Sequence, residues 1–521
     1  MCGFLDNAKA FDRIWHEGLF YKLHKLGLTG KVWQLIKHNY SNSFSFVSHS
    51  GEISNVYPVK QGVGQGRVMS AWFFLVYIND LIAMLRSAQC GIYVYGQHMP
   101  AILLADDTTI ISTSPSGLQR LLNIVNLYAD KWRLTYNATK SKIVIFQKSK
   151  TVLSFEYSLG ETALELFPSV TYGGILLTYN LLCKTRVDDY CRKARQHVNS
   201  LRPLGLNQSG LHPATCVKIW QRFVLKTSFY GCELLSNIHG KDIILLETTQ
   251  RYFARCVQGM DKRSSTGSTI ANLGLISMIG YIDQCKLQFI GSLFNMKCNT
   301  SPKHIFCAFI GTTNQDELNS KTICGDLVSV LYKYNLENYM YTYLQFGSFP
   351  VKSLWNKILR KAVFEKEECE WIHAVTLNTG LSRYRAIHSK LKLQEYWMLT
   401  YVYPKQKVQL QFCITVLSRA KISKECPLCI KHAYDYDKHI ILHCESLLAQ
   451  RNNFFNFLID ELDVDTYVRL EMQDEDDLIC TLFGANNTFN QNIDIEMKHR
   501  IMITFALFVY LLKPHLQYIW L

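Results

Sequence analysis

Hydrophobic and polar positions in the first 150 residues alternate between two spacings, one typical of strands and one typical of amphipathic helices. The helical spacing predicts helices over about His16–Leu26, from Thr29 onward, over Ser70–Leu81 and over Leu118–Trp132. Short apolar or alternating runs predict strands at Phe4–Leu5, Ser43–Val47, Gly91–Tyr95 and Lys142–Phe146. Strands that alternate with helices in this way are typical of an α/β or α+β layer.

Two adjacent acids stand between two of the strand-like runs. An apolar run within Met99–Ser112 leads to Asp106 and Asp107, and a β-branched run follows them. This pattern predicts a hairpin with both acids at its tip. Neighbouring ionised carboxylates repel each other, and a bound cation would offset that repulsion. Two other Asp-Asp pairs lie in polar surroundings, so a plain surface turn stays the alternative here.

Two earlier segments also carry candidate chemistry. Asp6 stands where the first predicted strand runs out, although Asp6 and Asp12 could simply cap the helix that follows. The segment Gln61–Gly66 has three glycines in five residues, which lets its backbone approach a ligand or another segment closely. It meets neither the dinucleotide-binding pattern nor the P-loop pattern.

Composition narrows the class of protein. A chain of 521 residues with 48% hydrophobic and 13% aromatic content predicts a folded protein of about two to four domains. The net charge is +14, although nine acids and one arginine fall within Asp460–Asp477. The rest of the chain is therefore strongly basic, which favours a polyanionic partner over a membrane surface.

The spacing of the cysteines and the length of the apolar runs indicate the cellular compartment in which we expect the protein. The 17 cysteines have no disulfide-framework spacing and no signal peptide precedes them, so we expect an intracellular protein of the nucleus or cytoplasm. The longest apolar run, Ile501–Leu512, is too short to span a bilayer and predicts a buried terminal helix.

A second cluster of candidate ligands lies near the C-terminus. Four residues have the spacing C-x2-C-x9-H-x4-C: Cys426, Cys429, His439 and Cys444. Thiolate and imidazole ligands in this spacing predict a closed, structural, tetrahedral Zn²⁺ site. His432 and His443 are competing donors with poorer spacing, and free buried thiols are the alternative to a metal site.

Five motifs, in this order over about 175 residues, resemble the reverse transcriptases of non-LTR (LINE-like) retrotransposons. They are Asp6 with Phe11, Gln65-Gly66, Ala105-Asp106-Asp107, Asn137-x-x-Lys140, and the primer-grip-like turn Tyr172-Gly173-Gly174-Ile175. The segment Tyr77–Leu81 matches the family as well. The chain departs from the usual pattern at Ala71, Leu104 and Gly173, none of which removes a catalytic group.

The resemblance implies a palm domain in which Asp6 and Asp106 hold two Mg²⁺ ions with Asp107 beside them. Two metal ions suit an in-line displacement because they bind the attacking and the leaving oxygen. By the same resemblance, Phe11 is the aromatic gate that excludes a ribose 2′-hydroxyl; simple core packing is its alternative role.

The resemblance also assigns the remaining substrate-binding residues. Gln65 and Gly66 contact the incoming nucleotide and the template, and Lys140 lies near the triphosphate. A solvated loop lysine is the alternative for Lys140. The basic helix that begins at Tyr190–His197 belongs to a thumb that follows the template–primer backbone, unless it is an ordinary solvated helix face.

We therefore predict an α+β protein: a right-hand polymerase palm with largely missing fingers, then a helical thumb and C-terminal region with a small zinc knuckle. The expected domains are 1–150 (palm with partial fingers), 151–270 (primer grip and thumb), 271–420 (helical connection), 421–450 (zinc knuckle) and 451–521 (C-terminal helices).

The expected function is that of an RNA-directed DNA polymerase from an incomplete retrotransposon copy. Its partners would be an RNA template, a DNA primer and deoxynucleoside triphosphates. A catalytically inactive, zinc-stabilised nucleic-acid-binding remnant is the alternative. A metal-dependent hydrolase is disfavoured because no general base accompanies the aspartates.

Overall fold

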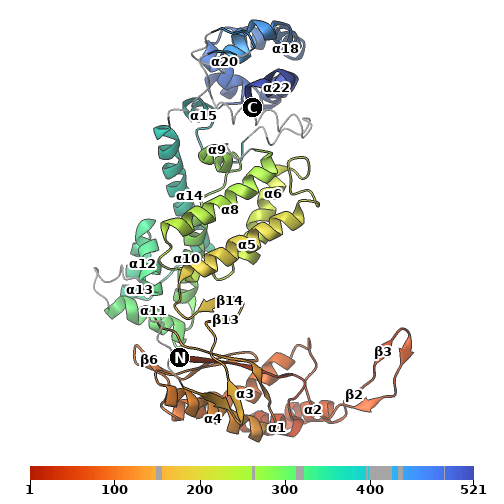
Figure 1. Cartoon of the computed structure of the whole chain (residues 1–521), viewed down its shortest axis with the longest axis vertical. Helices are drawn as coiled ribbons and strands as arrows, with labels where there is room; N and C mark the ends of the chain where they lie inside the picture. The colour runs from red at the N-terminus through yellow and green to blue at the C-terminus, as the bar shows by residue number, and fades with distance from the viewer. Residues whose placement is uncertain are drawn as a thin grey trace. The chain divides into compact units, whose positions relative to one another are not determined.

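A computed structural model of the chain, shown in Figure 1, describes most of its residues. The described residues are 1–147, 155–260, 265–312, 322–378, 381–394, 397, 425–426, 428–431, 438–485 and 487–520. They divide into two compact units, which we describe separately. Unit 1 comprises Met1–Leu182 with Asn299–Phe309, and unit 2 comprises Cys183–Cys298 with Ile310–Leu521.

Unit 1 is built around a four-stranded antiparallel sheet in the order β10-β1-β9-β8. Its strands are β1 (Cys2–Asn7), β8 (Ala101–Leu104), β9 (Asp107–Ile111) and β10 (Tyr136–Val144). The first strand of the chain thus lies inside the sheet, between two strands that follow it by a hundred residues or more. The expected mixture of helices and strands is confirmed.

Helices cover one face of this sheet (Figure 1). The helices of this part are α1 (His16–Lys25), α2 (Gly30–Ser41), α3 (Ser70–Ser87) and α4 (Pro115–Trp132). All four begin close to where the apolar spacing predicted. The capping role considered for Asp12 is wrong, because α1 starts at His16 with Trp15 at its N-cap.

The sheet has a buried face and an open face because successive residues of a strand point in opposite directions. On β1, Leu5 is buried in the core formed with α3 and α4. Phe4 and Asp6 are only partly buried, and the ring of Phe4 lies 5.5 Å from that of Tyr172. Phe4 and Asp6 therefore point to the face that the helices leave uncovered.

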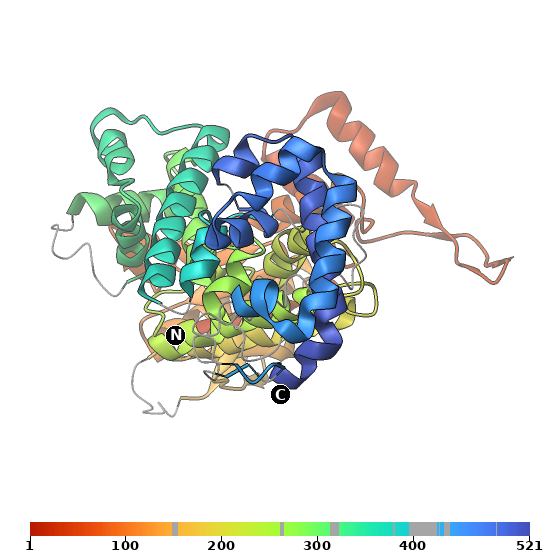
Figure 2. The ribbon, with the colours of Figure 1, turned by 90° about the horizontal axis from the view of Figure 1, so that it is seen from above.

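Five two-stranded hairpins complete unit 1. They are β2 (Phe44–Ser45) with β5 (Tyr57–Pro58), β3 (Ser48–His49) with β4 (Glu52–Ile53), β6 (Ile92–Val94) with β7 (Gln97–Met99), β11 (Tyr157–Leu159) with β12 (Thr162–Leu164), and β13 (Ser169–Tyr172) with β14 (Ile175–Thr178). The strand expected at Ser43–Val47 is only two residues long. It starts an arm that extends away from the rest of this unit (Figure 2).

The motif Tyr77–Leu81 has a structural role in α3. The Asp80 carboxylate accepts a 2.7 Å hydrogen bond from the buried Lys22 ammonium, which also lies over the rings of Tyr77, Tyr128 and Trp132. Burial lowers the pKa of Lys22 to about 8, and the bond to Asp80 opposes that shift. The ion pair and the rings tie α1 to α3 and α4.

Unit 2 is mainly helical. Its elements are α5 (Cys183–Leu201), α6 (Pro213–Ile219), η1 (Trp220–Val224), α7 (Leu225–Ser228), η2 (Cys232–Leu234), α8 (Gly240–Gln258), α9 (Thr266–Ala271), α10 (Met278–Asn295), α12 (Ile323–Lys333), α13 (Glu337–Phe346), α14 (Lys352–Leu377), α15 (Ser382–Ile387), η5 (His439–His443), η6 (Glu445–Leu447), α18 (Leu448–Glu461), α19 (Val464–Glu471), α20 (Glu475–Leu482), α21 (Thr488–Gln491) and α22 (Ile495–Trp520). Helix α11 (Ser301–Thr312) belongs to both units.

The core of unit 2 includes a stacked pair of rings, Trp220 and Phe253, whose centroids lie 4.5 Å apart. The predicted terminal helix is confirmed, because Ile501–Leu512 lies within α22 and supplies several buried side chains. Every cysteine that the structure describes is a free thiol. Among the described helices, none combines the length and the apolar character needed to cross a bilayer.

Two glutamates, Glu247 partly buried and Glu367 buried, accept hydrogen bonds at the start of α10. The Glu247 carboxylate accepts a 2.8 Å hydrogen bond from the Met278 backbone N–H, and Glu367 accepts one of 2.7 Å from the N–H of Ser277. Burial raises the pKa of Glu247 to about 7, helped by the charge of Glu367 and opposed by Arg251. The start of α10 is thus held by a carboxyl group that titrates near neutral pH.

We expect this group to make the protein less stable at pH 8 than at pH 5. A carboxyl group whose pKa is raised by folding favours the folded state below its unfolded pKa, and that contribution is lost as the pH rises through 7. The shift corresponds to about 3 kcal/mol. Urea unfolding at both pH values should show a smaller pH difference for Glu247→Gln than for the wild type. An equal difference in both proteins would contradict this assignment.

Candidate active site and candidate metal centre

The three aspartates singled out in the sequence lie at one end of the sheet of unit 1. Strand β1 pairs with β9 so that Asp6 stands directly opposite Asp107. The predicted hairpin is confirmed, but the prediction that both acids lie at its tip is wrong by one residue: Ala105 and Asp106 form the turn, and Asp107 begins β9 and pairs with Leu104. Ala105 adopts a positive φ of 51°, which lets the chain reverse within two residues. Sheet pairing therefore brings together acids that are 100 residues apart in sequence.

A cavity of about 210 Å³ opens beside this pair of strands. Its lining includes the carboxylates of Asp6 and Asp107 and the side chains of Lys140, Lys142 and Tyr172. Asp106 lies outside that lining, in the adjoining turn. Acidic and basic residues that line one small cavity suit a phosphate-bearing substrate that binds together with divalent cations.

The carboxylates repel one another. Partial burial raises the pKa of Asp107, and the charges of Asp106 and Asp6 raise it further. A divalent cation between the acids would reverse this effect, because it stabilises the ionised form of each carboxylate. The donor set is made of oxygen atoms only, as Mg²⁺ prefers.

The pairing of β10 with β1 is interrupted next to Asp6, and Lys140 lies within this interruption. Phe4 pairs with Lys142, whereas Asp6 pairs with Asn137, so an extra loop of β10 bulges out between them. The Asn137 side-chain oxygen accepts hydrogen bonds from the backbone N–H groups of Thr139 (3.1 Å) and Lys140 (3.3 Å). The motif Asn137-x-x-Lys140 is thus a local turn that fixes the bulge.

Ser141 joins this bulge to β1. Its buried hydroxyl accepts a 3.2 Å hydrogen bond from the Asp6 backbone N–H and donates one of 2.8 Å to the Asn137 carbonyl. Neither Ser141 nor Lys142 is among the site residues predicted from the sequence. Lys142 could have been found because it stands two residues from Lys140, and strand periodicity puts such residues on one face.

The turn compared with a primer grip forms the hairpin β13–β14, with Gly173 and Gly174 at its tip. Both glycines have positive φ values, 53° and 81°, as a two-residue hairpin turn requires. A Cβ atom added to Gly173 would lie 3.6 Å from the Leu104 side chain. The tip therefore lies beside the strand that leads to Ala105 and Asp106.

The glycine-rich segment lies against the residues that follow β1. The backbone N–H of Val63 donates a 2.8 Å hydrogen bond to the Phe11 carbonyl, and the Gln65 side chain donates one of 3.2 Å to Asp12. A Cβ on Gly62 would lie 2.7 Å from the Asp12 carbonyl oxygen, so only glycine fits there.

Phe11 is partly buried, and its ring centroid is 5.4 Å from that of Phe74. Part of the Phe11 side chain therefore packs against the core, which is the alternative role considered for it. Gly66 is exposed, with a φ of 79°. The structure thus places Phe11 and the segment containing Gln65 and Gly66 next to each other.

A second candidate site lies in unit 2, where four residues converge: Cys426, Cys429, His439 and Cys444. Their ligand atoms all lie within 4.8 Å of one another. The sulfurs of Cys426 and Cys444 are 4.0 Å apart, and the Cys429 sulfur is 3.1 Å from His439 Nε2. Tetrahedral zinc with sulfur ligands at about 2.3 Å separates its sulfurs by about 3.8 Å. The set can therefore hold a metal ion.

The surroundings of this site favour metal binding. Burial, with the neighbouring Cys426, raises the pKa of Cys444 to about 12, so without a cation its thiolate would be unstable. Burial lowers the pKa of His439, which keeps its imidazole neutral and able to bind a metal. The guanidinium of Arg451 donates a 2.7 Å hydrogen bond to the Cys444 carbonyl, which orients that ligand.

His443 does not belong to the convergent set. Its Nε2 atom lies 3.0 Å from the Glu475 carboxylate. The other competing donor, His432, lies outside the described residues. Of the two described candidates, His439 and His443, His439 is the one whose ring nitrogen lies near the cysteine sulfurs.

The sequence matches known proteins over its N-terminal part. Residues 1–160 match the family model described as reverse transcriptase (RNA-dependent DNA polymerase). They carry a reverse transcriptase domain. This domain contains the sheet, the three aspartates and the bulge described above.

Curated relatives extend the match beyond this domain. The chain is 26% identical over 237 residues to the RNA-directed DNA polymerase from mobile element jockey of Drosophila melanogaster. It is 26% identical over 264 residues to the probable RNA-directed DNA polymerase from transposon X-element of the same species. These matches cover 44% and 50% of this chain but only 25% and 28% of the relatives. The reverse transcriptase domain is therefore LINE-like, as its motifs predicted, and the chain spans about a quarter of the relatives' length.

Proposed function

We propose that this chain is an RNA-directed DNA polymerase of a non-LTR retrotransposon, and that the cavity between β1, β9 and β10 is its catalytic centre. The observation that carries the proposal is the pairing of Asp6 with Asp107, beside the Asp106 turn and in a cavity that Lys140 also lines. The reverse transcriptase domain and the named activity of the relatives support it.

In the proposed reaction, Asp6, Asp106 and Asp107 hold two Mg²⁺ ions, which supply charge stabilisation for nucleotidyl transfer. Lys140 and Lys142 face the same cavity and bind the triphosphate oxygens of the incoming nucleotide. Gln65 and Gly66 contact the nucleotide and the template, and Phe11 lies under the sugar. The 3′-hydroxyl of the primer is the nucleophile, and pyrophosphate leaves.

The β13–β14 hairpin would hold the primer end, since its tip lies beside Leu104 at the base of the Asp106 turn.

In unit 2, we propose that α5 belongs to a thumb that binds the backbone of an RNA template and a DNA primer. We also propose that Zn²⁺ occupies the Cys/His site as a structural ion. The free thiols are compatible with action inside the cell, in the nucleus or the cytoplasm.

Primer extension tests the proposal. We expect the full chain to extend a labelled DNA primer on an RNA template when Mg²⁺ and deoxynucleoside triphosphates are present, and to stop when either is withheld. A reaction without template controls for terminal addition. Failure to extend on any RNA template, with the protein folded, would overturn the proposal; template binding without extension would favour the inactive nucleic-acid-binding alternative.

A further inference from the structure

A concave surface of unit 2 lies between α8 and α5, the helix assigned above to the thumb. It encloses about 1150 Å³, and its walls come from the C-terminal half of α5, the loop after it, and the C-terminal half of α8. This volume exceeds the roughly 300–1,000 Å³ typical of small-molecule pockets. It is large enough for part of a polymer.

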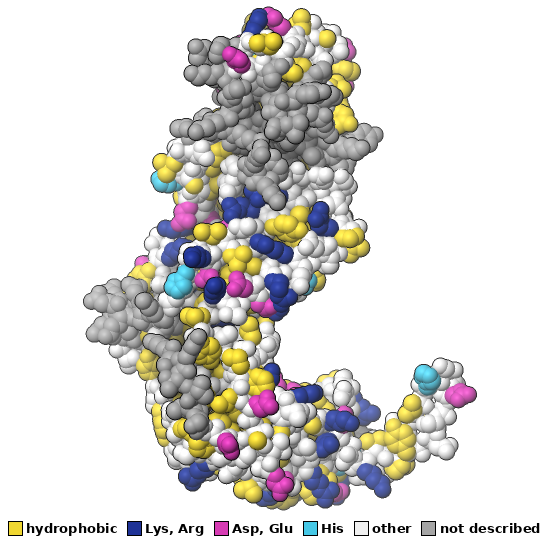
Figure 3. Space-filling view, in the orientation of Figure 1, with side chains coloured by type: hydrophobic (Ala, Val, Ile, Leu, Met, Phe, Trp, Pro, Cys, Tyr) yellow, Lys and Arg dark blue, Asp and Glu magenta, His cyan; other side chains and the backbone are white. Residues whose placement is uncertain are grey.

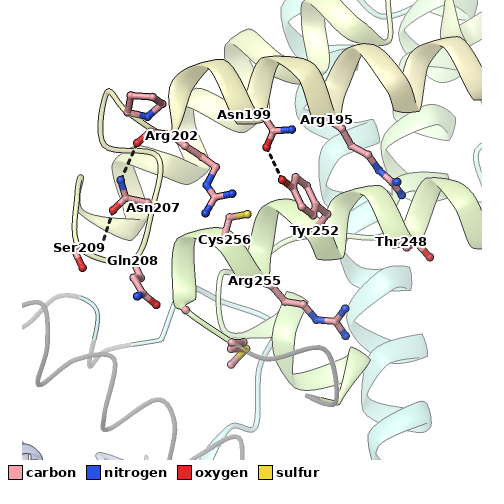
Figure 4. A pocket seen from close by; sticks show the side chains of 13 residues that line it. Arg195, Asn199, Arg202, Asn207, Gln208, Ser209, Thr248, Tyr252, Arg255 and Cys256 are labelled. Atoms are coloured by element: carbon pink, nitrogen blue, oxygen red, sulfur yellow. Dashed lines mark hydrogen bonds between the residues drawn. The ribbon is translucent and has the colours of Figure 1, made fainter.

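The pocket forms where α5 and α8 present polar side chains next to the apolar side chains that they pack into the core. The apolar residues of α5 and α8 pack into the core, among them Val198 and Phe253. One step around each helix, the side chains are polar: Arg195, Asn199 and Arg202 on α5, and Thr248, Tyr252, Arg255 and Cys256 on α8. Figure 4 shows Asn199 and Tyr252 meeting between the two helices, whereas Arg255 points away from α5. Since apolar side chains usually fill a gap between packed helices, this polar row needs another explanation.

The lining is positively charged. Three arginines, Arg195, Arg202 and Arg255, line the pocket, and no acidic residue does so among the residues described. Neither Arg195 nor Arg202 forms an ion pair with a residue that the structure describes, whereas Arg192 and Lys193 on the same helix both pair with Asp189. Lysine and arginine side chains also gather on this face of unit 2 (Figure 3).

An aromatic ring lies between the arginines. The Tyr252 hydroxyl donates a 2.5 Å hydrogen bond to the side-chain oxygen of Asn199, which holds the ring between the two helices (Figure 4). The Arg195 guanidinium lies 6.0 Å from the centre of that ring, and the Arg195 Nε atom is buried without a hydrogen-bond acceptor. The pocket therefore combines two arginines that form no ion pair with a described residue, Arg195 and Arg202, with an aromatic ring.

We propose that this pocket binds an unpaired stretch of single-stranded nucleic acid, with Arg195 and Arg202 on its phosphates and a base against Tyr252. Arginine binds phosphate oxygens through several N–H groups, and base–aromatic stacking tolerates any base. A flexible strand can turn a phosphate and a base into a recess, whereas a stiff duplex presents its phosphates along a convex surface. The site would hold the strand without reading its sequence.

The test uses the full chain and a labelled oligouridylate without Mg²⁺ or nucleotides. We expect Arg195→Gln with Arg202→Gln to weaken binding of this single strand at least about tenfold. The slope of log affinity against log salt should fall by about 1.4, since each phosphate contact to a single strand contributes about 0.7. The matched control is Lys357→Gln with Arg360→Gln, which removes two exposed charges from α14 and should leave binding unchanged.

A cross-linking experiment localises the strand. An oligonucleotide containing 4-thiouridine should cross-link to the wild-type peptide that carries Tyr252 and Cys256, and this product should disappear in the double arginine variant. Equal binding by the variant and the wild type, or cross-links confined to unit 1, would each overturn the inference.

This inference goes beyond the proposed polymerase activity and fails separately from it. Asp106→Asn should abolish primer extension and leave strand binding by the pocket intact. If primer extension fails in the wild type while the cross-link to Tyr252 forms, the polymerase proposal alone is wrong. If extension succeeds and the arginine variant binds the strand normally, the pocket inference alone is wrong.

Discussion

Replacing Asp106 by asparagine should reduce RNA-templated primer extension about a thousandfold or more. The substitution keeps the size of the side chain but removes a charge that metal binding needs, and metal ions supply several kcal/mol of transition-state stabilisation. Asp107→Asn should have a similar effect, because Asp107 stands opposite Asp6 and lines the cavity. Single-nucleotide incorporation at saturating substrate is the measurement, since it separates loss of turnover from loss of binding.

The matched control for these variants is Asp130→Asn. Asp130 is an exposed acid on α4 of the same unit, and the lining of the cavity does not include it. Its variant should extend primers at the wild-type rate. Near-normal extension by Asp106→Asn would mean that this carboxylate holds no metal ion, and the catalytic assignment would fail.

Replacing Cys426 and Cys444 together by serine should remove one zinc ion per chain and unfold the segment around η5. Binding of structural zinc in small domains is worth about 10–16 kcal/mol in apparent free energy, which is comparable to the whole stability of a typical domain. Both sulfurs are buried in the core of unit 2 with Leu447 and Phe454, so the damage should reach α18. Metal analysis and hydrogen exchange of the described residues 438–458 are the measurements.

A double variant of exposed cysteines, Cys298→Ser with Cys369→Ser, is the control for that experiment. It removes two thiols far from the metal-site motif in sequence and should keep both the zinc and the slow exchange. A zinc content equal to that of the wild type in Cys426→Ser with Cys444→Ser would contradict the zinc proposal and leave four free thiols.

Much of the reverse transcriptase domain could be predicted from sequence because its elements have clear periodicity. The helices α1, α3 and α4 and the hairpin around Asp106 follow from apolar spacing alone. The convergence of Cys426, Cys429, His439 and Cys444 also follows from their spacing, because a local turn at Cys426 and Cys429 brings both thiols within reach of His439. In these segments, local propensity and tertiary packing favour the same structure.

Other features depend on contacts that no local pattern reveals. Which acid faces Asp6 is decided by the register between β1 and β9, and register is a property of two strands. The bulge that Ser141 stabilises is also a tertiary feature, because it depends on a hydrogen bond to another strand. A serine within a predicted strand does not by itself indicate such a bulge. The pocket between α5 and α8 depends on two helix faces more than 50 residues apart in sequence.

The central position of β1 also has consequences for synthesis on the ribosome. Its neighbours β9 and β10 are translated more than 100 residues later, so the strand that carries Asp6 must wait without partners while the intervening helices emerge. At about 5–20 residues per second, this delay lasts about 5–20 seconds or more. During that interval an exposed apolar strand can pair with another nascent chain, and we therefore expect the yield of folded protein to depend on translation speed and on chaperones.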